Sequence, residues 1–155
     1  MLEALWINRP VIQWLILIAF IALAFWRGAA PERQAALTFI GMFIADRLYH
    51  CIFGAGLFFL HANTGHILID AIALYAFAVI ALRANRFYPL WLASFQLMTI
   101  ASHIVRAVNP NILNGAYAVL AFAPSYLEVI VFAVGVVLHL RRQRKYGQYP
   151  SWQDS

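Results

Sequence analysis

Residues 41–54 read GMFIADRLYHCIFG, and this stretch decides the fold because it sets an acid, a base and an imidazole within a long apolar run. The three ionisable residues are Asp46, Arg47 and His50. Ionisable side chains are costly inside a bilayer, and they persist where they pair with one another, line a cavity or take part in chemistry. We therefore expect a membrane protein whose working interior includes this stretch.

The composition agrees with a membrane location. The chain has 155 residues, of which 64% are hydrophobic and 11% are charged, whereas soluble domains have about 45–50% apolar and about 25% charged residues. Several apolar runs approach or exceed the roughly 18–20 residues that cross the hydrocarbon core. These values exclude an ordinary soluble domain and predict an all-α, polytopic integral membrane protein.

Five transmembrane helices are expected, separated by loops that glycine, proline and charged residues mark. Their expected ranges are 10–26, 35–60, 66–82, 88–108 and 116–140, and a polar cytoplasmic tail follows over 141–155. They are expected to make one membrane domain in which the second to fifth helices form a bundle. The first helix is expected at the periphery, because Gln13 is its only strongly polar residue.

Basic residues predict the orientation of the chain. With five spans and a cytoplasmic C-terminus, the following loop bases all face the cytoplasm: Arg27, Arg33, Arg83, Arg86, Arg141, Arg142, Arg144 and Lys145. Only Arg9 and Arg106 then fall near the opposite side, as the positive-inside rule requires. We expect the N-terminus outside and a bacterial-type inner membrane. Because topology accounts for the net charge of +5, no nucleic-acid partner is expected.

Polar residues within the spans fall into two expected groups. Asp46 and Arg47 are predicted near mid-bilayer together with Glu128 of the last span, with His50 just above them. The outer group comprises His61, His66, Asp70, His103 and Arg106. The residues predicted to form a ligand-binding site or a structural polar core are Asp46, Arg47, His50, Gln96, His103 and Glu128.

A metal site is a further hypothesis for the outer group. His66 and Asp70 are four residues apart on one helix, a spacing that suits metal binding or a carboxylate that orients an imidazole. Together with His103 they are the candidate ligands, and these residue types suit zinc or iron. A structural role is the simpler interpretation, because there is no HExxH motif and the single cysteine, Cys51, excludes a CxxC motif.

Three functions compete. The first is a small inner-membrane binding or accessory protein, in contact with the lipid bilayer and with a membrane-complex partner, that receives an apolar small molecule with a polar head. The second is a membrane-embedded redox enzyme that uses haem or a divalent metal, with His50 and His103 as the candidate haem ligands. The third is proton-coupled transport or conduction by a homo-oligomer, in which Asp46, His50 and Glu128 titrate. The residues leave open whether the protein is an enzyme.

Overall fold

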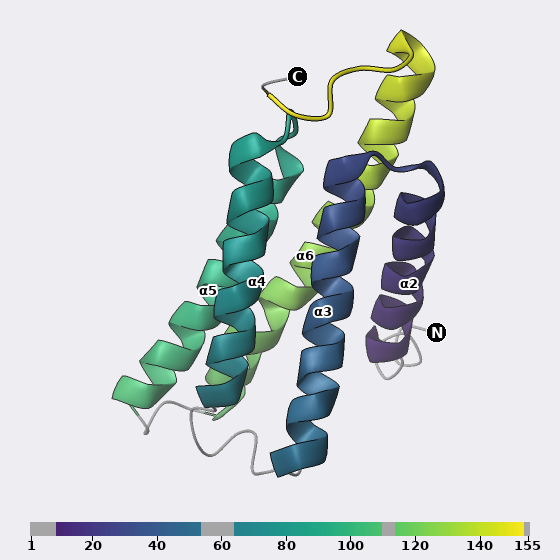
Figure 1. Cartoon of the computed structure of the whole chain (residues 1–155). Coiled ribbons are helices and arrows are strands. Elements are labelled where there is room, and N and C mark those ends of the chain that lie inside the picture. The colour runs from purple at the N-terminus through teal and green to yellow at the C-terminus, as the bar shows by residue number, and fades with distance from the viewer. Residues whose placement is uncertain (1–8, 54–63, 110–113, 154–155) are drawn as a thin grey trace.

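The computed structural model describes residues 9–53, 64–109 and 114–153, and these residues form an all-helical fold (Figure 1). The prediction of an all-α chain is therefore confirmed. The described helices are α2 (Arg9–Arg27), α3 (Ala30–Phe53), α4 (Thr64–Arg83), α5 (Tyr88–Val108) and α6 (Asn114–Tyr146).

Four of these helices contain segments long and apolar enough to cross a membrane. The segments are Pro10–Arg27, Ala30–Phe53, Gly65–Arg83 and Phe122–Tyr146. The exception among the described helices is α5, which carries Gln96, Ser102, His103 and Arg106, and all four of these polar residues are buried. The polar face of α5 is thus turned toward the other helices.

The helices pack into a bundle in which α6 is inclined to α3 and α4 (Figure 1). Helix α5 packs against α4 and α6, and α3 packs against α4, while α2 lies against α6 and α3. Three phenylalanine rings join α3, α4 and α6 in the core: the Phe39 ring centroid lies 5.3 Å from that of Phe77 and 5.2 Å from that of Phe132. Aromatic pairs at this separation add to the stabilisation gained by burial.

Helix α3 begins five residues earlier than the expected start at residue 35, because residues predicted as a loop fit a helical first turn. Proline is tolerated in the first turn, where its missing N–H has no partner to lose, and Pro31 occupies such a position. The backbone N–H of Ala29 donates to Oε2 of Glu32 at 3.1 Å, which caps the helix. Glu32 also places a negative charge at the positive end of the helix dipole.

Helix α6 continues through the basic residues that were assigned to the tail and ends at Tyr146. Gly147 then adopts a positive φ of 74°, which glycine tolerates at the end of a helix, and its N–H donates to the carbonyl of Gln143 at 2.9 Å. The chain turns back across the bundle end (Figure 1). There Asn85 N–H donates to the Ser151 carbonyl at 3.1 Å, and Gln153 N–H donates to the Arg83 carbonyl at 2.9 Å. The tail is therefore pinned to the α4–α5 connection.

Candidate functional site

Two histidines and an aspartate meet where α3 faces the first turn of α4, and we call Asp46, His50 and His66 the histidine site. Asp46 and His50 are one helical turn apart on α3, so both side chains point the same way. Oδ1 of Asp46 lies 3.5 Å from Nε2 of His50 and 3.1 Å from Nε2 of His66. Their side chains are partly buried, with exposed fractions of 31%, 21% and 13% for Asp46, His50 and His66.

Tyr49 and Gly65 hold the two imidazoles in place. The Tyr49 ring centroid lies 5.7 Å from that of His50 and 5.3 Å from that of His66, in edge-on arrangements. A side chain at position 65 would collide with the Tyr49 ring, so the ring can approach α4 only because residue 65 is glycine. The two imidazole centroids are themselves 5.1 Å apart.

The histidine site differs from the metal site expected from the sequence. Among the described residues, the group whose candidate ligand atoms all lie within 4.8 Å of one another is Asp46, His50 and His66, whereas the predicted ligands were His66, Asp70 and His103. His66 faces α3 and hydrogen-bonds to Asp46. Asp70 is one turn farther along α4 and faces α5 instead. The i,i+4 spacing placed both residues on one side of α4 but could not tell which neighbouring helix each would meet.

A second cluster, the buried polar site, consists of Asp70, Gln96, His103 and Glu128. The Gln96 side-chain amide donates to Oδ1 of Asp70 at 2.8 Å, and Nε2 of His103 lies 3.4 Å from Oδ2. Glu128 on α6 is 3% exposed, and its Oε1 has no hydrogen-bond partner among the described residues. Asp70 of α4 contacts two side chains of α5, and Glu128 of α6 interacts electrostatically with Asp70, so the cluster joins three helices.

The expected central group of Asp46, Arg47 and Glu128 is divided between two clusters. Asp46 belongs to the histidine site, whereas Glu128 belongs to the buried polar site. Arg47 has a 65% exposed side chain that lies over the Phe43 ring, with its guanidinium carbon 5.2 Å from the ring centroid. Its Nε is 3.9 Å from Oδ2 of Asp46, at the limit of an ion pair. Asp46 lies level with His66, which is in the first turn of α4.

His50 and His103, the pair considered as haem ligands, have different carboxylate partners. His50 lies beside Asp46, and His103 lies beside Asp70. His61 was expected in the outer group and lies outside the described residues.

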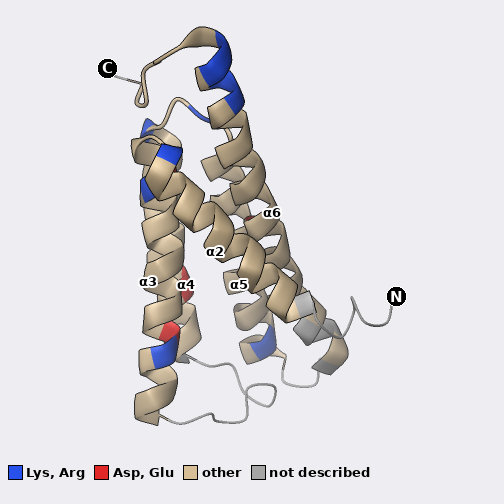
Figure 2. Ribbon diagram, turned by 90° about the vertical axis from the view of Figure 1, so that its right-hand side faces the viewer, with Lys and Arg blue, Asp and Glu red and all other residues tan. Residues whose placement is uncertain are grey.

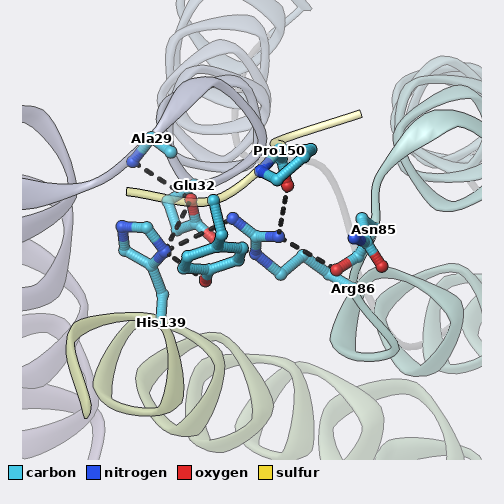
Figure 3. Close-up of polar contacts among 7 residues, drawn as sticks. Ala29, Glu32, Asn85, Arg86, His139 and Pro150 are labelled. Carbon is cyan, nitrogen blue, oxygen red and sulfur yellow. Dashed lines mark hydrogen bonds and ion pairs between the residues drawn. The ribbon is translucent and has the colours of Figure 1, made fainter. Parts of the chain in front are cut away.

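A third cluster lies at the opposite end of the bundle, and sequence reasoning missed it. This tail network consists of Glu32, Arg86, His139 and Tyr149, which come from α3, the α4–α5 connection, α6 and the tail. Figure 3 shows Glu32, Arg86 and His139 turned toward one another. Nε of Arg86 donates to Oε1 of Glu32 at 3.2 Å, and the two side chains are 6% and 0% exposed. Nδ1 of His139 lies 2.7 Å from the Tyr149 hydroxyl and 3.4 Å from Nη2 of Arg86.

The tail covers the ion pair of Arg86 and Glu32. Nη1 of Arg86 donates to the carbonyl of Asn85 at 2.9 Å and to that of Pro150 at 3.5 Å (Figure 3). Two guanidinium groups lie against the Tyr149 ring, with the carbons of Arg86 and Arg142 at 4.3 Å and 4.2 Å from its centroid. Because the Arg86 side chain contacts Glu32, His139 and two backbone carbonyls, the tail network has a structural role. The only sequence signal was an acid and a base in separate expected loops.

Comparison of the chain with protein-family models, with curated proteins and with solved structures gives no match. Its function is therefore inferred from its own side chains.

Proposed function

We propose that this protein is a small integral membrane protein that binds a divalent transition-metal ion, of the zinc or ferrous class, at Asp46, His50 and His66. The supporting observation is the separation of the ligand atoms. Zinc binds imidazole nitrogen and carboxylate oxygen at about 2.0–2.2 Å, so neighbouring ligands of a tetrahedral ion lie about 3.4 Å apart. The 3.1 Å and 3.5 Å separations from Oδ1 of Asp46 fit this spacing.

The number of ligands favours a binding role over a structural one. Structural zinc sites are closed by four protein ligands, whereas sites that exchange ligands or act on them keep one position open. Three side chains of this chain converge, which leaves a position for water, for a small molecule or for a ligand from a partner protein. This fits the hypothesis of a binding or accessory protein, and a second copy or a membrane-complex subunit would complete the coordination.

For the topology we propose five spans, including α5, with the N-terminus outside and the C-terminus in the cytoplasm of a bacterial-type inner membrane. Burial of Gln96, His103 and Arg106 lets α5 cross the bilayer without presenting these groups to lipid. Lys and Arg residues gather at the end of the bundle that carries the tail (Figure 2). The positive-inside rule then assigns that end to the cytoplasm.

Metal titration of the purified protein in detergent tests the binding proposal. Cobalt(II) is the probe, because its visible absorption reports both binding and coordination number, and zinc should displace it at one equivalent. We expect His50→Ala and His66→Ala to weaken binding by about 100-fold or more, since removal even of an outer-shell partner costs about 10–100-fold. His103→Asn is the matched control, because it removes an imidazole that pairs with Asp70 instead.

Two results would contradict the proposal. Cobalt absorption that is weak and unaffected by the His50 and His66 substitutions would remove the metal site. Loss of binding in His103→Asn but not in His50→Ala would assign the ion to the ligands expected from the sequence, His66, Asp70 and His103.

Glu128 favours proton-coupled transport as a second candidate function. A buried carboxyl group whose Oε1 has no partner among the described residues must be neutralised by a proton or a cation when it lies within a membrane. An oligomer could pass protons between this group and Asp70. The expected result is proton flux in liposomes that Glu128→Gln abolishes and Arg47→Gln leaves unchanged; equal flux in the Glu128→Gln variant would exclude the candidate.

A further inference from the structure

A pocket opens at the basic end of the bundle, apart from the three polar clusters. It has a volume of about 540 Å³ and is lined by Gln34 of α3, by Val79 and Arg83 of α4 and by Trp152 of the tail. Pockets that hold small molecules have volumes of about 300–1,000 Å³. The pocket is therefore large enough for a polar headgroup.

Trp152 reaches this position because the tail is folded back onto the helices. Trp152 pairs with Ala84 in an isolated antiparallel bridge, and the flanking residues Ser151 and Gln153 hydrogen-bond to Asn85 and Arg83 through the backbone. One wall of the pocket is thus supplied by a segment far away in the sequence. Tryptophan is favoured at the level of lipid headgroups, where its ring meets apolar chains and its N–H meets polar groups.

Arg83 supplies a positive charge that is available to a ligand. Neighbouring Arg86 is engaged by Glu32 and by two backbone carbonyls, but no carboxylate among the described residues pairs with Arg83, whose side chain lies in the exposed class. A guanidinium group forms strong, charge-assisted hydrogen bonds with phosphate oxygens. Arg83 also ends the apolar segment Gly65–Arg83, which places it where a span meets the headgroups.

An apolar surface leads away from the pocket toward the middle of the bundle. Ile72, Tyr75 and Val79 precede Arg83 at helical spacing on one face of α4, and Ile72 and Tyr75 are 62% and 73% exposed. On α3, Leu37 follows Gln34 by three residues and is 54% exposed. Acyl chains can lie against such a surface while a headgroup stays at the pocket.

We propose that this pocket binds the phosphate headgroup of an anionic phospholipid, whose acyl chains lie along the exposed apolar faces of α3 and α4. Basic pockets between helices at the cytoplasmic end of membrane proteins suit such headgroups. The lipid bridges the tail and two helices, so its binding favours the docked tail. The assignment does not depend on the metal site.

Lipid titration of delipidated protein in a nonionic detergent tests the proposal. Dioleoylphosphatidylglycerol is the probe, dioleoylphosphatidylcholine is the zwitterionic control and inorganic phosphate is the headgroup-only control. Native mass spectrometry counts bound lipid and thermal unfolding reports its effect. We expect one tightly held phosphatidylglycerol that raises the unfolding temperature, with much weaker effects of the other two ligands.

Substitutions locate the site. Arg83→Gln should weaken phosphatidylglycerol binding by about tenfold or more, as expected for loss of a hydrogen bond from a charged donor. Arg141→Gln makes the same change of charge at an exposed α6 position outside the pocket and should alter binding less than about threefold. Gln34→Leu changes a pocket residue on a different helix and should also weaken binding. It replaces Arg83→Gln as the test if that variant does not fold.

The outcomes are distinct. Equal losses in Arg83→Gln and Arg141→Gln would mean that lipid binds only through general surface charge and would overturn the proposal. Equal stabilisation by inorganic phosphate would show an anion site that does not recognise lipid, and it too would overturn the assignment. Loss of binding in Arg83→Gln and Gln34→Leu alone would support it.

Discussion

Nε2 of His66 lies 3.1 Å from Oδ1 of Asp46, and this contact joins two helices at residues 20 positions apart in the chain. It gives the histidine site both its geometry and its link between α3 and α4. A ligand that binds only the folded site should therefore stabilise the whole bundle.

Asp46→Asn should abolish the stabilisation of the folded protein by metal. In the wild type, an ion at about 100 times its dissociation constant should raise the free energy of unfolding by about 2.7 kcal/mol. Thermal unfolding in detergent with and without zinc measures the difference. Arg47→Gln is the control, since its side chain is 65% exposed and only at the limit of an ion pair with Asp46. An undiminished zinc effect in Asp46→Asn would show that this carboxylate is no ligand.

Glu32→Gln should destabilise the protein strongly. Loss of one partner of a buried ion pair costs about 3–5 kcal/mol because the other charge stays buried without compensation, and Arg86 is only 6% exposed. Glutamine keeps an oxygen for the Ala29 N–H, so the change isolates the charge. Denaturant unfolding of both single variants and of Glu32→Gln/Arg86→Gln measures the coupling. Additive losses in the double variant would mean that the pair does not act as a unit.

High pH should weaken docking of the tail through Tyr149. Burial raises the pKa of the Tyr149 hydroxyl, and the nearby Arg86 guanidinium only partly offsets this. The folded protein therefore holds this proton when the unfolded chain has lost it. The stabilisation is complete below the ordinary tyrosine pKa of about 10 and is lost as the pH rises through the raised value.

Thermal unfolding of wild type and Tyr149→Phe between pH 8 and pH 12 checks this expectation. The wild type should lose more stability than the variant above about pH 10. Parallel curves for the two proteins would indicate that ionisation of Tyr149 does not contribute.

Gly135→Ala should destabilise the packing of α6 against the start of α5. A methyl group at this position would lie 2.5 Å from Cγ of Tyr88, so the ring or the helix must shift, and such overpacking costs about 1–3 kcal/mol. Gly41→Ala is the matched control, because nothing lies within 4 Å of the added carbon. It should stabilise α3 by about 0.5–1 kcal/mol. Comparable free energies of unfolding for both variants would argue against the tight contact.

The sequence was most informative where a local signal coincides with a helix boundary. The predicted range 88–108 is the observed range of α5, where a proline lies in the first turn and breakers follow the last. The predicted start of α3 was five residues too late, because Pro31 and Glu32 suit both a loop and a first helical turn. Periodicity also placed Asp46 and His50 on one face of a helix, as the structure has them.

The partners of these side chains could not be predicted, because they depend on how each helix is rotated against its neighbours. His66 and Asp70 share a side of α4, yet one meets α3 and the other α5. The contacts of the tail network are even harder to predict from the sequence. It joins residues up to 117 positions apart, from Glu32 to Tyr149 (149 − 32 = 117), and no local pattern marks such a contact.

The docked tail also bears on how the protein can be handled in the laboratory. A reporter joined directly after residue 153 would begin close to the α4–α5 connection, because backbone hydrogen bonds hold residues 151 and 153 there. A short linker would pull on those bonds, so topology reporters and purification handles are better joined through a generous spacer.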